Sequence, residues 1–219
     1  MAQHYFDSSP DAASRPSTAD LVLPDVHLRL HTDRGVFSPD KVDLGTRVLL
    51  ESVPAPPPEG DLLDVGCGYG PIALTLAHRA PNARVLGVDV NARAVSLARR
   101  NATEHRMDHA RFSVITPEGG LALEQGQGTA AQPEADDLLG PFDVIWSNPP
   151  IRVGKDILHT LLLTWLSRLA PGGVAHLVVQ RHLGSDSLQK WLEAQGHPTE
   201  RLASRAGFRV LTVHPAPTT

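Results

Sequence analysis

Three short segments hold the residue types that could perform chemistry in this chain. Asp-Val-Gly-Cys-Gly-Tyr-Gly occupies residues 64–70, Asp89 closes an apolar run, and Ser-Asn-Pro-Pro-Ile occupies residues 147–151. A glycine turn between a strand and a helix lets unpaired backbone N–H groups face a bound ligand. The first two segments therefore predict a nucleotide-type cofactor pocket. The third predicts a rigid clamp for a planar amino group.

The predicted clamp follows the apolar run at residues 142–146, at the sheet edge where ligands of open α/β folds bind. Two prolines supply no backbone donor and hold an extended path, so the Asn148 side-chain oxygen and the Pro149 carbonyl can accept hydrogens from one exocyclic amine. These bonds direct the nitrogen lone pair toward an electrophilic sulfonium methyl group. The three segments together indicate methyl transfer from S-adenosylmethionine. The alternative for this segment alone is a proline-stopped loop.

Asp89 is the candidate ligand of a cofactor ribose. It lies 23 positions after Gly66, close to the spacing of about 20 residues at which an acidic side chain reaches ribose hydroxyls. Its alternative role is to cap a helix that starts near Asn91. The glycine turn could also serve strand-to-helix packing alone. A nicotinamide dehydrogenase would use similar geometry, but position 71 is Pro and the third glycine of the dinucleotide pattern is missing.

The elements that must position these segments alternate along the chain beyond residue 60. Alternation of apolar strands and amphipathic helices is typical of a parallel sheet covered on both faces. We therefore expect an α/β, Rossmann-like fold with a mostly parallel seven-stranded sheet. The expected strands include 62–65, 84–88, 110–115, 142–146 and 174–179, and the expected helices include 71–80, 92–101, 155–169 and one starting at Ser185.

We divide the chain into three regions. Residues 1–19 are rich in Ser, Pro and Asp and are expected to be flexible. Residues 20–59 are expected to form an N-terminal extension with a β-hairpin, a short helix and a Pro-rich connector. Residues 60–219 would form the catalytic domain, with a loop or insertion at residues 117–140.

Composition narrows the functional classes. With one cysteine, Cys67, the chain has no disulfide framework, which suits a reducing cytoplasm. No apolar stretch is long enough to span a bilayer, so we expect no membrane association. The formal charge of −4 argues against binding polyanions over the whole surface, although a local basic patch could hold RNA. His105 and His109 lack a metal-binding pattern around them, and we propose no metal.

The motifs resemble those of the small-domain class I S-adenosylmethionine-dependent methyltransferases, which include guanine N2-methyltransferases of small-subunit ribosomal RNA. Besides the three segments above, the resemblance rests on Gly-Val-Phe-Ser at 35–38, Asp-Leu-Gly-Thr at 43–46 and Ile-Arg-Val-Gly-Lys at 151–155. It covers most of residues 35–213. It implies S-adenosyl-L-methionine as the cofactor and ribosomal RNA, or the small ribosomal subunit, as the partner.

The resemblance also implies roles for individual residues. The candidate cofactor-binding residues are Asp64, Gly66, Cys67, Gly68, Gly70, Asp89 and Val90, with Phe37 and Thr46 contributed by the N-terminal extension and Glu118 as a candidate for the adenine amino group. The candidate catalytic clamp is Asn148, Pro149, Pro150 and Ile151. Arg152 and Lys155 are candidates for substrate phosphates, the alternative being a solvated first helical turn. Phe37 could instead be a core aromatic under the hairpin.

One departure from the family pattern bears on the target. Many amino methyltransferases place Tyr or Phe after the two prolines to stack on a base, whereas this chain has Ile151. The leading hypothesis is an enzyme that methylates an exocyclic amine, with guanine N2 in ribosomal RNA as the first choice. A protein glutamine N5-methyltransferase and a non-catalytic S-adenosylmethionine-binding RNA module are the alternatives, and an oxidoreductase is a more distant one.

Overall fold

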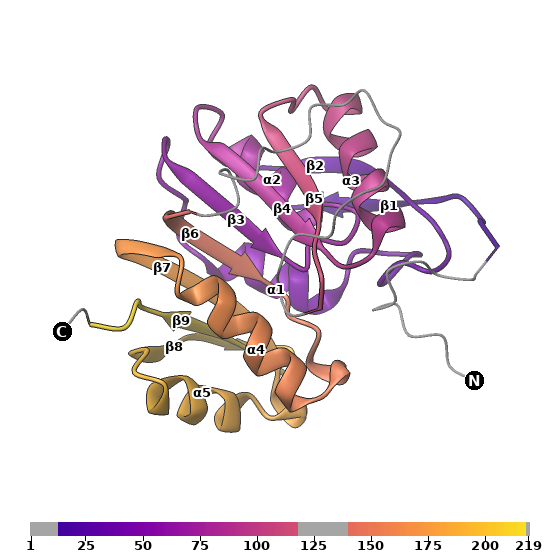
Figure 1. Ribbon diagram of the computed structural model, residues 1–219. Helices are drawn as coiled ribbons and strands as arrows, with labels where there is room; N and C mark the ends of the chain where they lie inside the picture. The colour runs from indigo at the N-terminus through magenta and orange to yellow at the C-terminus, as the bar shows by residue number, and fades with distance from the viewer. Residues whose placement is uncertain (1–12, 118–139, 218–219) are drawn as a thin grey trace.

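Seven strands form one sheet, and its topology confirms the expected α/β architecture (Figure 1). Across the sheet the order is β5 (Ala110–Val114), β4 (Arg84–Asp89), β3 (Asp61–Val65), β6 (Phe142–Ser147), β7 (Leu169–Gln180), β9 (Phe208–Val213) and β8 (Thr199–Arg205). Strands β3 to β7 pair in parallel, and β9 pairs antiparallel with β7 and β8. The computed structural model describes residues 13–117 and 140–217.

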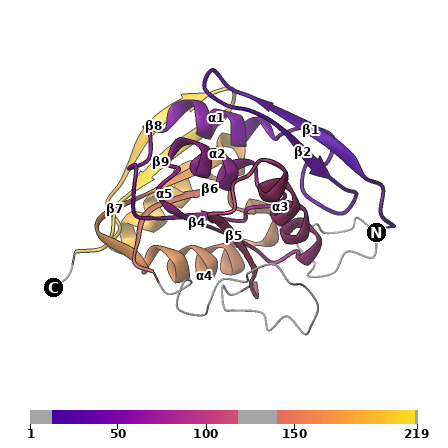
Figure 2. The ribbon, with the colours of Figure 1, turned by 90° about the horizontal axis from the view of Figure 1, so that it is seen from above.

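Helices cover both faces of the sheet, as expected (Figure 2). One face carries α1 (Leu44–Ser52), α2 (Pro71–Arg79) and α3 (Ala92–Glu104), and the other carries α4 (Lys155–Leu166) and α5 (Ser185–Ala194). Side chains alternate along each strand, so Leu62 joins the first apolar cluster and Leu63 the second. In the described ranges, none of these helices has the length and apolar character needed to cross a bilayer.

The N-terminal extension begins with the expected hairpin, formed by β1 (Ser17–Val22) and β2 (His27–Thr32) in antiparallel register. Strand β1 starts inside residues 1–19, which the sequence assigned to a flexible segment, and at residues 17–19 that prediction was wrong. The reason is that Ala19 and Leu21 are both buried, so the apolar alternation extends further toward the N-terminus than the hairpin turn suggested.

The boundary between α4 and β7 also differs from the prediction. The helix ends at Leu166, whereas the apolar period predicted it to reach residue 169. Leu169 continues that period but pairs with Phe142 of β6 as the first residue of β7. The pairing then shifts register before Val144 pairs with Val174, so residues 170–173 are absorbed by a bulge. The predicted strand at 174–179 is the regular part of β7.

Asn101 on α3 ties the hairpin to the main domain. Its side-chain oxygen accepts the His31 N–H at 2.8 Å, and its amide donates to the carbonyl oxygens of His31 at 3.0 Å and Tyr69 at 2.9 Å. Asn101 is fully buried. One side chain therefore satisfies two backbone groups of β2 and one carbonyl of the glycine loop.

Replacing Asn101 with alanine should lower the free energy of unfolding by about 3 kcal/mol, because one buried and two partly buried backbone groups lose their partner at about 1 kcal/mol each. Denaturant unfolding measures the change. Thr103, exposed on the same helix, provides the control, since Thr103→Ala should stay within about 0.5 kcal/mol of the wild type. Equal midpoints for the two variants would contradict the role assigned to Asn101.

Candidate active site

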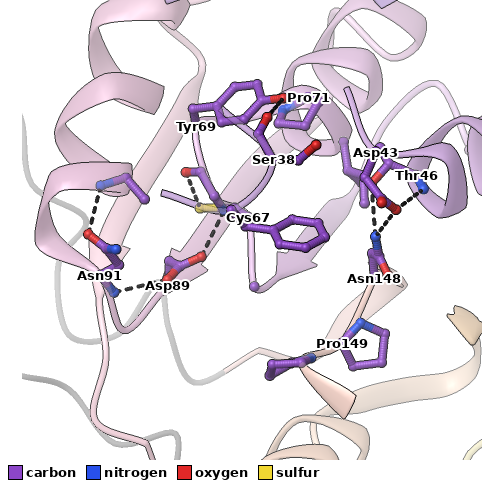
Figure 3. A pocket seen from close by; sticks show the side chains of 16 residues that line it. Ser38, Asp43, Thr46, Cys67, Tyr69, Pro71, Asp89, Asn91, Asn148 and Pro149 are labelled. Carbon is purple, nitrogen blue, oxygen red and sulfur yellow. Dashed lines mark hydrogen bonds between the residues drawn. The ribbon is translucent and has the colours of Figure 1, made fainter. Parts of the chain in front are cut away.

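A pocket opens at the carboxyl edge of the sheet (Figure 3). Its volume is about 720 Å³ when the part open to solvent is included. The N-terminal extension, the glycine loop, the end of β4 and the end of β6 all contribute to its wall. The lining residues are Phe37, Ser38, Asp43, Thr46, Gly66, Cys67, Gly68, Tyr69, Pro71, Ile72, Asp89, Asn91, Ala94, Asn148, Pro149 and Pro150.

The glycine loop presents bare backbone to the pocket. Gly66 and Gly68 have φ values of 78° and 55°, a region in which L side chains are strained. A Cβ atom built on Gly68 would meet nothing within 4 Å, so the space before the loop is open. Cys67 lies between them, and burial raises the pKa of its thiol. The loop therefore fits a ligand that approaches the backbone closely.

Asp64 supports the loop without lining the pocket. The side chain is fully buried, and one carboxylate oxygen accepts the Ala73 N–H of α2 at 3.0 Å. Among the described residues, its other oxygen has no partner. Burial raises the pKa of Asp64 well above its usual value. Two other predicted cofactor residues are likewise absent from the lining, since Gly70 precedes α2 and Val90 is buried in the second apolar cluster.

Asp89 lines the pocket and is bonded to the glycine loop. One oxygen accepts the Gly68 N–H at 2.8 Å, and the other accepts the Asn91 N–H at 2.9 Å. Burial raises the pKa of this carboxyl group. Helix α3 is capped by the Asn91 side chain, which accepts the Ala94 N–H at 3.1 Å. The capping alternative for Asp89 was therefore wrong.

The Asn148 side chain is held by the N-terminal extension (Figure 3). Its amide nitrogen donates to Asp43 at 3.0 Å and to the Thr46 hydroxyl at 3.1 Å. These two bonds use both amide hydrogens. Both bonds are made by the nitrogen, so they leave the Asn148 side-chain oxygen unbonded to Asp43 and Thr46. It is the atom available to accept a hydrogen from a ligand.

The two prolines do not continue as an extended segment. Pro150 has φ −76° and ψ 77°, and the Pro149 carbonyl accepts the Ile151 N–H at 2.9 Å. This geometry is an inverse γ-turn, so the predicted extended path was wrong at Pro150. A carbonyl oxygen has two lone pairs, and the Pro149 oxygen keeps one for a ligand.

The turn leads Ile151 out of the lining and into η2 (Ile151–Val153). There Ile151 packs, partly buried, on the second apolar cluster, as Val153 and Trp191 also do.

The other predicted site residues differ in position. Arg152 and Lys155 are exposed and lie beyond the lining. Glu118, the candidate for the adenine amino group, lies outside the described residues. Phe37 lines the pocket with 40% of its surface exposed.

The sequence did not assign site roles to Ser38, Asp43, Tyr69 or Asn91. The Tyr69 hydroxyl donates to the Ser38 carbonyl at 3.3 Å, and the Asn91 amide donates to the Gly35 carbonyl at 2.8 Å. These bonds fasten the N-terminal extension to the glycine loop and to the end of β4. An aspartate before a helix is a capping signal that marks Asp43, but its contact with a residue 105 positions away has no local signature.

The described residues fit S-adenosylmethionine as a cofactor. The open glycine cradle and the pocket-facing Asp89 are groups that a zwitterion with a ribose could use. Within residues 13–117 and 140–217, no three His, Cys, Asp or Glu side chains gather in a way that could hold a metal ion.

Sequence comparison finds full-length and partial relatives. The chain is 30% identical to the uncharacterized protein YbxB of Bacillus subtilis, over 96% of this chain and 98% of that protein. It is 34% identical to the ribosomal RNA small subunit methyltransferase C of Aeromonas hydrophila, and 30% identical to the large subunit methyltransferase G of Shewanella amazonensis. These matches cover 80% and 81% of this chain, but 46% and 43% of the two enzymes. The chain thus spans under half the length of these named methyltransferases.

Among solved structures, the T. thermophilus 16S rRNA N2 G1207 methyltransferase (RsmC), in complex with AdoMet and guanosine, has the same fold. The TM-score is 0.63 at 24% identity, and the match covers 94% of this chain and 52% of that one. The family model for the methyltransferase small domain matches residues 27–212. Because the match runs from the hairpin into the last strand, the chain belongs to the methyltransferase small domain family and is an S-adenosylmethionine-dependent methyltransferase.

Proposed function

We propose that this enzyme methylates an exocyclic amino group, and that the group is guanine N2 in ribosomal RNA. The observation that carries the proposal is the fixed orientation of Asn148. Its nitrogen is bonded to Asp43 and Thr46, which leaves its oxygen as an acceptor, and the neighbouring Pro149 carbonyl keeps a lone pair. The pocket edge therefore offers two acceptors at adjacent positions.

Two acceptors suit a group that carries two hydrogens. A primary amine or amide satisfies both, whereas a carbonyl satisfies neither and would leave polar groups desolvated without a bond. Accepting both hydrogens fixes the plane of the amine and leaves its lone pair directed across the pocket. The bound cofactor supplies an electrophilic methyl group, so the chain's own contribution is alignment and charge stabilisation.

Ribosomal RNA is the favoured target for three reasons. The named relatives are ribosomal RNA methyltransferases of both subunits. Phe37 offers an exposed aromatic ring at the pocket, and flipped bases are bound by stacking on such rings. Arg152 and Lys155 are exposed beyond the clamp, where cations can contact phosphates. This substrate would place the enzyme in the cytoplasm.

A glutamine side chain in a protein is the second candidate. Its primary amide presents the same two hydrogens to the clamp. The position of Ile151 favours it, because no ring follows the prolines in the pocket and a side-chain amide needs none. A cofactor-binding module without catalysis is the third reading.

Transfer of radiolabelled methyl from S-adenosylmethionine tests the proposal. The acceptors are assembled small and large ribosomal subunits, deproteinised ribosomal RNA, and a release-factor protein. Label recovered as N2-methylguanosine after nuclease digestion supports it, and label in protein supports the glutamine alternative. If none of these acceptors is labelled while S-adenosylhomocysteine binds, the non-catalytic module is favoured.

A further inference from the structure

Asp43 joins the start of α1 to the clamp. One of its carboxylate oxygens accepts the backbone N–H groups of Gly45 at 2.8 Å and Thr46 at 3.3 Å, which caps the helix. The same oxygen accepts an amide hydrogen of Asn148 at 3.0 Å. The Thr46 hydroxyl, on a residue only 4% exposed, accepts the other at 3.1 Å. The helix cap and the clamp are thus one hydrogen-bonded unit.

This unit selects between two orientations of Asn148. The oxygen and the NH2 group of a primary amide are nearly equal in size, so a half-turn about the last side-chain bond exchanges them at little steric cost. In the turned orientation the Asn148 oxygen would face the Asp43 carboxylate and the Thr46 hydroxyl oxygen. The hydrogen bond to Asp43 would be lost, and two negative oxygens would be in contact there. The Thr46 hydroxyl could donate to the turned oxygen, so Asp43 sets the orientation while Thr46 holds the amide in place.

The orientation decides the chemistry of the clamp. With the nitrogen held by Asp43 and Thr46, the clamp presents oxygen to the pocket. In the turned orientation it would present an NH2 donor, which repels an incoming amine and attracts a carbonyl. An acceptor beside the reacting nitrogen also stabilises positive charge as the methyl group is transferred, whereas a donor would oppose it.

We propose that Asp43 and Thr46 are positioning residues that hold the Asn148 oxygen toward the acceptor amine. The inference rests on the proposed methylation of an exocyclic amine and deepens it. Residues of the N-terminal extension would then take part in catalysis, with Thr46 acting through Asn148.

The chain offers matched variants for the test. Thr46→Val removes the hydroxyl acceptor with almost no change of shape, and Thr46→Ser restores it. Asp43→Ser keeps a residue type that caps helices as well as aspartate does, but its shorter side chain withdraws the acceptor from Asn148. Unfolding midpoints of all three variants report whether the helix cap survives.

Two readouts separate positioning from a structural role. In protein labelled with 15N-asparagine, the Asn148 side-chain amide is assigned as the signal absent from Asn148→Ala, and it should shift in Thr46→Val but not in Thr46→Ser. In the labelled-methyl assay with ribosomal RNA, Thr46→Val should lower kcat about tenfold, as expected for one hydrogen bond, and Asp43→Ser about 30-fold. KM for S-adenosylmethionine should stay within about twofold of the wild type in Thr46→Ser and Thr46→Val.

The inference is overturned if Thr46→Val and Asp43→Ser leave both the amide signal and kcat unchanged. It is also overturned if Thr46→Ser behaves like Thr46→Val, since the hydroxyl would then be irrelevant. An inactive wild type would contradict the proposed function and not the positioning role. The shift of the amide signal would still report whether Asp43 and Thr46 hold Asn148.

Discussion

Replacing Asn148 with alanine is expected to lower kcat about 10²- to 10³-fold, the usual cost of removing one preorganised polar group that faces a reacting centre. The variant loses one of the two acceptors that fix the amine plane. Affinity for S-adenosylhomocysteine should change little, because the Asn148 side chain bonds to Asp43 and Thr46 and not to the glycine loop. Single-turnover methyl transfer to ribosomal RNA and calorimetry measure the two effects.

Asn82 provides the matched control, since it is an exposed asparagine in the turn that precedes β4, at the other end of that strand from the pocket. Asn82→Ala should keep both kcat and cofactor affinity. If Asn148→Ala turns over ribosomal RNA as fast as Asn82→Ala, the acceptor clamp is not the source of catalysis. An unchanged RNA affinity in an already inactive wild type would favour the binding module.

Features with a local signature were predictable from the sequence. The alternation of apolar segments gave the parallel sheet, and the glycines at 66 and 68 marked a turn that only glycine adopts easily. The Asn-Pro-Pro segment falls at the carboxyl edge because β6 ends immediately before it. Each of these features depends on residues that are adjacent in the sequence, so the sequence alone is enough to predict it.

Features that depend on side-chain packing or on a backbone angle that the residue type leaves free were not predictable. Asp64 was expected to contact the cofactor, but its carboxylate accepts the Ala73 N–H and lies outside the lining. Ile151 was expected in the clamp, but the inverse γ-turn at Pro150 leads it onto the second apolar cluster. A proline fixes φ and leaves ψ free, so the sequence could not distinguish a turn from an extended path.

Asp89 carries the second large expected effect. Replacing it with alanine should weaken the binding of S-adenosylhomocysteine about 100-fold, equivalent to about 2.7 kcal/mol, the size of two charge-assisted hydrogen bonds to a ribose. A carboxylate has about four acceptor sites, and the bonds to Gly68 and Asn91 leave capacity facing the pocket. Calorimetric titration measures the affinity. With saturating cofactor, kcat should stay within about threefold of the wild type, because ribose contacts act on ground state and transition state alike.

Weaker cofactor binding in Asp89→Ala has a competing explanation. Asp89 also accepts the Gly68 N–H, so its removal could disturb the glycine loop. A titration with methionine alone separates the two, since methionine contains no ribose and would report on the glycine loop. Asp61 is the control acid. It lies at the end of β3 away from the pocket and is paired with Arg84, so Asp61→Asn should bind cofactor normally. Full cofactor affinity in Asp89→Ala would remove the ribose assignment. If Asp89→Ala loses affinity for S-adenosylhomocysteine but still binds methionine normally, the lost affinity is explained by a ribose contact.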